Sequence, residues 1–246
     1  MHHLRTMKIT YLSAFIIASF TAITIFSSCH MACEKGSGKL STETRNAGVF
    51  SKITVSGPFN VTVKQDSVAS IKVTGDDNLM KEIKTNISGD ELEIKTEDGV
   101  CPSGQVSVSI STKSLSSIKT SGTVKLASDG KITTKDMAFD FSGSTKANMD
   151  LNADNVSTAG SGLTDLTLTG QAVSHKMNLS GSGQVDALNF VVGQYRIESS
   201  GATNIKINVL NDLSVNSSGA SDIEYRGNPK TISNNKSGIG SLKKVD

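Results

Sequence analysis

The sequence predicts an all-β fold: a parallel β-helix (solenoid) with rungs of about 19 residues, preceded by a less regular β-rich part. Three observations support this prediction. Ser-Gly dipeptides recur at nearly constant spacing, polar and apolar residues alternate after each of them, and no repeat holds 10–12 residues with helical periodicity. A fixed period of this length is typical of solenoids, in which each repeat stacks on its neighbours.

The Ser-Gly dipeptides occur seven times, at intervals of 21, 19, 19, 20, 18 and 19 residues. We expect a sharp bend at each one, where glycine adopts a positive φ without Cβ strain and serine bonds to neighbouring backbone groups. A catalytic serine would not recur seven times, so we interpret these residues as structural turns. They are Ser121 and Gly122, Ser142 and Gly143, Ser161 and Gly162, Ser180 and Gly181, Ser200 and Gly201, Ser218 and Gly219, and Ser237 and Gly238.

The residues after each serine alternate with a period of two. The fifth position is apolar in every repeat, while the fourth position is polar. Such alternation indicates a strand with one buried face, and a looser alternation before the serine predicts a second short strand. We name the first six residues of the fourth position the polar ladder, and we expect them to form an outward row that is a candidate contact surface. The polar ladder consists of Lys125, Lys146, Asp165, Gln184, Asn204 and Asp222.

The folded domain is predicted to span residues 49–246. Its first part, residues 49–104, holds short alternating segments separated by turn residues, which indicates irregular β structure. One short helix is expected over residues 78–84, capped by Asp77. Residues 105–246 form the predicted Ser-Gly solenoid.

Residues 1–28 have the features of a lipoprotein-type signal peptide. A basic start precedes a long apolar stretch, and two small residues come directly before Cys29. This end resembles a bacterial lipobox, so Cys29 is the predicted lipidation site and the membrane is a predicted partner through the lipid. Phe26 departs from the leucine that such motifs usually carry. Met7 is an alternative start to Met1, and an uncleaved membrane anchor is the alternative reading of the stretch.

Residues 29–48 have almost no apolar content, which predicts a flexible tether between the anchor and the domain. Cys33 and Cys101 lie far apart in the sequence, so we expect neither a disulfide framework nor a metal site from them. Removing residues 1–28 takes away two of the 25 basic residues and none of the 23 acidic ones, leaving 23 of each. A neutral balance argues against nucleic acid or an anionic membrane surface as a partner, since either would favour a basic excess.

The domain resembles a known family of bacterial envelope proteins. The segment from Phe50 to Gly57, then Asn60 to Val63, then Gly75 to Leu79, leads into the train of Ser-Gly repeats. Together these segments look like the putative auto-transporter adhesin, head GIN domain family (domain of unknown function 2807), over roughly residues 49–240. The resemblance implies a right-handed β-helix, common in Bacteroidetes lipoproteins, and a role in adhesion. It carries over no catalytic or binding residue.

Little in the sequence points to catalysis or to a cofactor. His175 is the single histidine after the tether, and we expect it to pack on a rung rather than to serve a Ser-His-Asp site. Two repeats, around Asp165 and Asp186, echo calcium-binding nonapeptides, yet their glycines are misplaced and the period is 19 rather than nine. No metal and no cofactor is therefore predicted.

Two classes of function remain open at this point. Many β-helices degrade polysaccharides as lyases or hydrolases, but Asp165 and Asp222 are expected three rungs apart, about 14 Å by strand spacing. Paired carboxylates in glycoside hydrolysis lie ~5–9.5 Å apart. We therefore favour a non-catalytic outer-membrane lipoprotein, on the cell surface or the periplasmic face, that presents the polar ladder to a glycan or protein ligand. A periplasmic structural or sensing module is a further alternative.

Overall fold

The computed structural model describes residues 33–97 and 99–246. The predicted signal peptide, residues 1–28, and the predicted lipidation site Cys29 lie outside the described residues. Residues Glu34–Asp246 form one compact unit, to which the following description applies.

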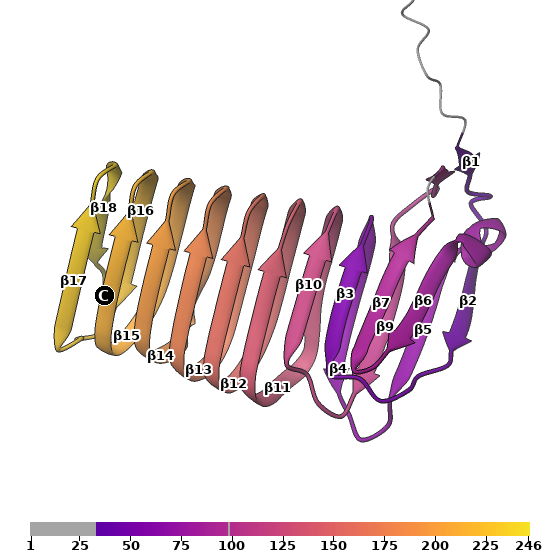
Figure 1. Ribbon diagram of the computed structural model, residues 1–246, viewed down its shortest axis with the longest axis horizontal. Helices are drawn as coiled ribbons and strands as arrows, with labels where there is room; N and C mark the ends of the chain where they lie inside the picture. The colour runs from indigo at the N-terminus through magenta and orange to yellow at the C-terminus, as the bar shows by residue number, and fades with distance from the viewer. Residues whose placement is uncertain (1–32, 98) are drawn as a thin grey trace, which may run out of the picture. The chain divides into compact units, whose positions relative to one another are not determined.

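This unit is a parallel β-solenoid of about seven turns that follows a less regular β part, as predicted (Figure 1). The irregular part contains β1 (Glu34–Lys35), β2 (Leu40–Arg45), β3 (Lys52–Ser56), β4 (Phe59–Gln65), β5 (Ser70–Asp76), η1 (Asp77–Glu82), β6 (Ile83–Ser88), β7 (Glu91–Thr96), β8 (Val100–Cys101) and β9 (Val106–Thr112). The regular part contains β10 (Ser117–Ser121), β11 (Thr123–Phe141), β12 (Ser144–Gly160), β13 (Leu163–Leu179), β14 (Ser182–Ser199), β15 (Ala202–Ser217), β16 (Ala220–Arg226), β17 (Thr231–Lys236) and β18 (Ile239–Lys244).

Each of the strands β11 to β15 makes one complete rung. Neighbouring strands pair in parallel and nearly in register, so that β12 and β13 are matched from Ser144 and Leu163 to Gly160 and Leu179. This offset of 19 residues is the predicted repeat. The two short strands expected in each rung are instead one long strand that runs between successive Ser-Gly bends, with register shifts inside some of the ladders.

The glycines of the bends are required for two different reasons. The expected positive φ is present at Gly122 and Gly143, with φ values of 90° and 79°. The five later bend glycines do not have it. There, the rungs approach so closely that a side chain has no room: a Cβ on Gly201 would overlap the carbonyl oxygen of Gly181 on the rung before.

Hydrogen bonds across successive bends fix this close stacking. The backbone N–H of Leu163 donates to the Gly143 carbonyl at 2.8 Å, and the same bond recurs on the following rungs. The Ser142 hydroxyl donates to the Thr120 carbonyl at 3.0 Å. The bends therefore hold the rungs together as well as turning the chain, as expected of structural Ser-Gly residues.

The inward face of every rung forms one continuous core. The apolar residues predicted to point inward are buried along the solenoid, and large aromatic side chains such as Phe139, Phe141 and Phe190 fill its middle. Buried hydroxyls near the bends pair with one another, as in the 2.7 Å contact between Thr120 and Thr145. Pairing removes most of the cost of burying a polar group.

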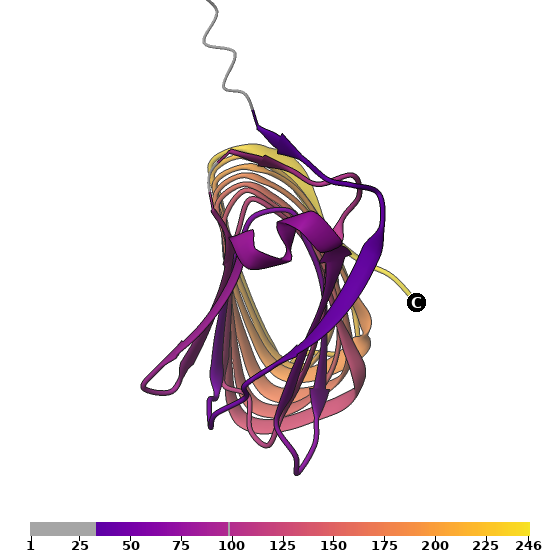
Figure 2. The ribbon, with the colours of Figure 1, turned by 90° about the vertical axis from the view of Figure 1, so that its right-hand side faces the viewer.

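A short helix closes the amino-terminal end of the solenoid (Figure 2). Leu79 and Met80 of η1 are buried there, as their spacing suggested. The helix is a 3-10 helix that ends at Glu82, shorter than the predicted 78–84. The prediction of Asp77 as its cap was wrong: Asp76 occupies the N-cap position, with no side-chain capping bond. The carboxylate of Asp76 is instead bonded to residues of other segments.

The segment predicted as a flexible tether is ordered in its described part. Strand β2 pairs antiparallel with β5 over six residues, from Leu40 opposite Asp76 to Arg45 opposite Ile71. None of its six residues is buried. Backbone pairing and polar contacts hold this strand, and such contacts leave no apolar pattern in the sequence. For this reason the composition alone indicated disorder.

The expectation of no disulfide was also wrong. Cys33 and Cys101 are both disulfide-bonded. Strand β1 pairs in parallel with β8 and places Lys35 opposite Cys101. The sequence gives no sign of the pairing of β1 with β8, because the two short strands lie far apart along the chain.

The stacking at the bends makes a direct prediction. Replacing Gly201 with alanine forces a Cβ against a backbone carbonyl and should lower the free energy of unfolding by about 1–3 kcal/mol. Gly104→Ala is the matched control, because a Cβ there meets nothing within 4 Å. Urea denaturation of both variants measures the difference. Equal stability of the two variants would show that the bends can open without cost.

Candidate functional site

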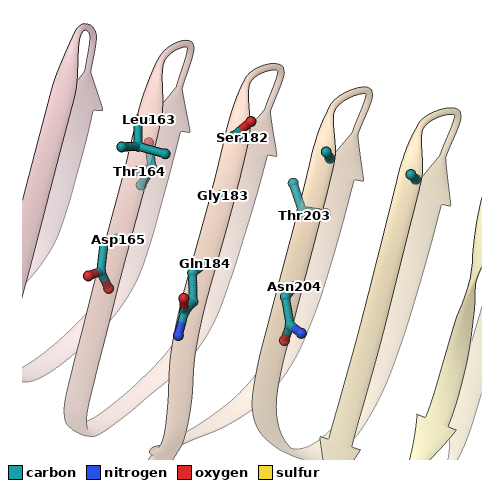
Figure 3. A pocket seen from close by; sticks show the side chains of 10 residues that line it. Leu163, Thr164, Asp165, Ser182, Gly183, Gln184, Thr203 and Asn204 are labelled. Atoms are coloured by element: carbon teal, nitrogen blue, oxygen red, sulfur yellow. The ribbon is translucent and has the colours of Figure 1, made fainter.

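The polar ladder is a continuous outward row on the solenoid. Strand pairing places Lys125 beside Lys146, Lys146 beside Asp165, Asp165 beside Gln184, Gln184 beside Asn204, and Asn204 beside Asp222. Figure 3 shows Asp165, Gln184 and Asn204 on successive strands with their side chains directed away from the core. The structure thus brings together all six residues of the predicted candidate surface.

A shallow groove lies beside the ladder on strands β13 to β16, with a volume of about 520 Å³. It exists because the row two residues after each serine carries small side chains here, Ser182, Ala202 and Ala220. Leu163 borders the groove and is 57% exposed. The sequence analysis missed this hollow, although the small residues in register two positions after the serines were a signal that could have revealed it.

Three of the six ladder residues are already engaged within the protein. Lys146 Nζ lies 2.6 Å from Asp165 Oδ2, and the Ser241 hydroxyl donates to Asp222 at 2.8 Å. In the middle, the side-chain amides of Gln184 and Asn204 have no hydrogen-bond partner among the described residues. Two adjacent amides with free donors and acceptors therefore face the groove.

Two other polar rows on the solenoid are hydrogen-bonded from rung to rung. Asn155 Nδ2 donates to Asp136 at 2.8 Å, and the Ser174 hydroxyl donates to Asn155 Oδ1 at 2.9 Å. Gln171 Nε2 likewise donates to Asn152 Oδ1 at 3.2 Å. Amides in stacked rungs can thus bond to one another, whereas Gln184 and Asn204 beside the groove do not.

His175 lies inside the solenoid and is only 1% exposed, as expected of a histidine that packs on a rung. Its Nε2 is 2.9 Å from the Thr158 hydroxyl, and its ring lies 5.2 Å from that of Tyr195, centroid to centroid. Burial lowers the pKa of His175 to about 3 and raises that of the Tyr195 hydroxyl. A neutral imidazole enclosed in this way has no route to a substrate.

The acidic residues of the ladder are separated by the rungs between them. Asp165 and Asp222 lie three rungs apart in register, about 14 Å at the usual strand spacing. This spacing exceeds the ~5–9.5 Å of paired glycosidase carboxylates. Within residues 33–97 and 99–246, no group of three or more His, Cys, Asp or Glu side chains is arranged to hold a metal ion. The same part of the chain has no helix long and apolar enough to cross a membrane.

Fold and surface together define a β-solenoid that presents an extended polar face. The chain belongs to the family described as "Putative auto-transporter adhesin, head GIN domain", whose model matches residues 49–229. The resemblance noted in the sequence is thereby confirmed. A search of curated proteins found no match.

Several solved structures have a similar fold. A putative adhesin from Bacteroides fragilis has a TM-score of 0.81 at 21% identity, covering 86% of this chain and 100% of that one. A putative lipid binding protein from Parabacteroides distasonis has a TM-score of 0.70 at 19% identity, covering 87% and 99%. A putative adhesin from Parabacteroides merdae has a TM-score of 0.63 at 18% identity, covering 87% and 100%. At these identities the likeness shows the fold.

The buried histidine predicts how stability depends on pH. Burial holds the pKa of His175 at about 3 in the folded state, whereas the unfolded chain has the ordinary pKa of 6.5. Below pH 6.5 the unfolded chain therefore binds the proton more readily than the folded protein does. The free energy of unfolding should fall by about 1.4 kcal/mol per pH unit as the pH drops from about 6.5 to 4.5. Urea denaturation across this range measures the slope.

His175→Met is the control for this prediction, since it keeps an inward side chain and removes the titrating group. Its stability should be nearly flat over the same range. The window stops above the region where protonation of the aspartates with lowered pKa, such as Asp66 and Asp90, adds its own loss of stability. An unchanged slope in His175→Met would contradict the assignment.

Proposed function

We propose that this chain is a non-catalytic protein of the bacterial cell envelope that binds its ligand through the groove beside the polar ladder. In this proposal residues 1–28 direct export and a lipid on Cys29 holds the protein at the membrane. The observation that supports ligand binding is the pair of unbonded amides, Gln184 and Asn204, beside a hollow lined by small side chains.

The chemistry of the groove favours a neutral ligand rich in hydroxyl groups, such as a glycan. Each amide offers both donors and an acceptor, as hydroxyl pairs require. The nearest charges compensate each other, because Lys146 is paired with Asp165. Ala202, Ala220 and the exposed part of Leu163 give an apolar strip against which a sugar ring can pack. A protein surface of similar polarity is the alternative ligand.

Several observations support an envelope location. The family is described as an auto-transporter adhesin head. Cys33 and Cys101 are disulfide-bonded, and disulfides persist in oxidising compartments outside the cytoplasm. The lipobox-like sequence before Cys29 supports a lipid anchor.

The contact surface is tested by removing its two free amides. The double variant Gln184→Ala, Asn204→Ala should bind an array of neutral glycans about 5–150-fold more weakly, because two hydrogen bonds contribute roughly 1–3 kcal/mol together. Glycan-array binding of the purified mature protein measures the loss, with a panel of extracellular matrix proteins on the same slides.

The matched control is Asn152→Ala, Gln171→Ala, which removes the same two residue types from a self-bonded pair elsewhere on the solenoid. It should bind as the unaltered protein does. If both double variants bind equally well, the groove is not the contact surface. Loss of binding to a matrix protein, with no glycan bound by any form, would replace the glycan by the protein ligand.

A further inference from the structure

Residues 34–45, which we name the strap, lie against the amino-terminal end of the solenoid, where η1 follows β5. We name this end the cap, and three of its consecutive side chains hold the strap. The backbone N–H of Gly38 donates to Asp76 Oδ1 at 2.8 Å. The Ser37 hydroxyl donates to Asp77 Oδ1 at 2.6 Å, and the Ser37 N–H donates to Asn78 Oδ1 at 2.8 Å. All three acceptors belong to the end of β5 and the start of η1.

The side chain of Asp76 is the centre of this attachment. It is 2% exposed and also accepts bonds from the Ser103 N–H at 2.8 Å and the Ser103 hydroxyl at 2.6 Å. These bonds, first of all the one from the Ser103 side chain, hold the pKa of Asp76 below its usual value. A Cβ on Gly36 would overlap this carboxylate, so the strap lies directly against it.

Both ends of the strap are held. At its start, Asn78 Nδ2 donates to the Lys35 carbonyl at 2.9 Å, and Lys35 itself pairs with β8. At its end, Arg45 Nη2 donates to the Met80 carbonyl at 2.8 Å. The six-residue pairing of β2 with β5 lies between them. Figure 2 shows β2 and η1 together at this end of the solenoid.

Fixing the strap shortens the link to an upstream anchor. A free segment of residues 29–48 could extend to roughly 65–70 Å at 3.3–3.6 Å per residue. With the chain held from Glu34 onward, five residue steps remain from Cys29, which span at most about 18 Å. An anchor at Cys29 therefore keeps the cap close to whatever surface holds the anchor.

We propose that the strap makes the cap the membrane-proximal end of the solenoid, with the lipid bilayer surface as the partner of the cap, and directs the groove away from the bilayer. This inference rests on the lipid anchor in the proposed function. Along the sheet, β13 is five strands beyond β7, about 24 Å at the usual spacing, and β17 is three strands farther, about 38 Å from β7. The groove would thus stand clear of the surface that the cap faces.

The test uses the full mature lipoprotein in vesicles of phosphatidylethanolamine and phosphatidylglycerol that carry an energy acceptor on their headgroups. A fluorescent amino acid replaces either Lys81 in the cap or Asn235 in β17, and energy transfer to the headgroups is measured. We expect transfer from position 81 to exceed that from position 235 by at least about threefold, given their separation along the rungs.

Two alterations should reduce this ratio. The variant Asp76→Ala, Asn78→Ala, measured with the disulfide bonds of Cys33 and Cys101 reduced, releases the start of the strap. Under the same conditions Asp66→Ala, which changes an aspartate that does not touch the strap, is its control. Should the release variant fail to fold, a second alteration leaves every described residue unchanged. It inserts 20 Gly/Ser residues after His30, which adds a root-mean-square reach of about 25 Å. Either alteration should lower the ratio at least about twofold, and Asp66→Ala should leave it unchanged.

Anchor and strap can fail separately in this experiment. Absence of a lipid mass on Cys29 and of flotation with vesicles would overturn the anchor of the proposed function and this inference with it. A protein that is lipidated and floats, yet shows equal transfer from both positions or no response to the inserted linker, would overturn the strap alone.

Discussion

The close stacking of backbone at the Ser-Gly bends is the constraint on which the rest of the structure depends. Because a carbonyl of one rung occupies the space where a Cβ of the next would lie, each rung can sit in only one position on its neighbour. That position sets the register of long strands such as β12 and β13, and the register sorts side chains into inward and outward rows. The groove and the polar ladder follow from the same rows.

The repeat period made the solenoid predictable. Every rung packs in the same way, so the alternation of polar and apolar residues recurs in all seven repeats. This recurrence identified the strands, the inward positions and the alignment of the ladder from Lys125 to Asp222. The sequence could not reveal why the later glycines recur, because φ > 0 and close approach select the same residue. It also left the groove unnoticed, since a hollow arises from what small side chains such as Ala202 and Ala220 leave empty.

The amino-terminal part resisted prediction for a different physical reason. Contacts between segments about 30 to 70 residues apart determine three features of this part. These features are the strap, the disulfide-bonded cysteines and the bonds of Asp76 at the start of η1. Apart from the disulfide bonds, these contacts are hydrogen bonds to carboxylates and backbone, which leave no periodic apolar pattern in the sequence. Composition reports how much surface a segment can bury, and residues 40–45 bury little. Low apolar content therefore indicated freedom where specific polar bonds impose order.

A solenoid separates the residues that hold the fold from those that are free to bind. The inward rows and the bends carry the packing, so outward rows can change with little effect on stability. Several outward polar side chains nevertheless bond to the next rung, as Asn155 does with Asp136. Leaving Gln184 and Asn204 unbonded forgoes that small gain. Since the backbone beneath them is rigid, a ligand that satisfies both amides has only their side chains to order, and this pre-organisation favours binding.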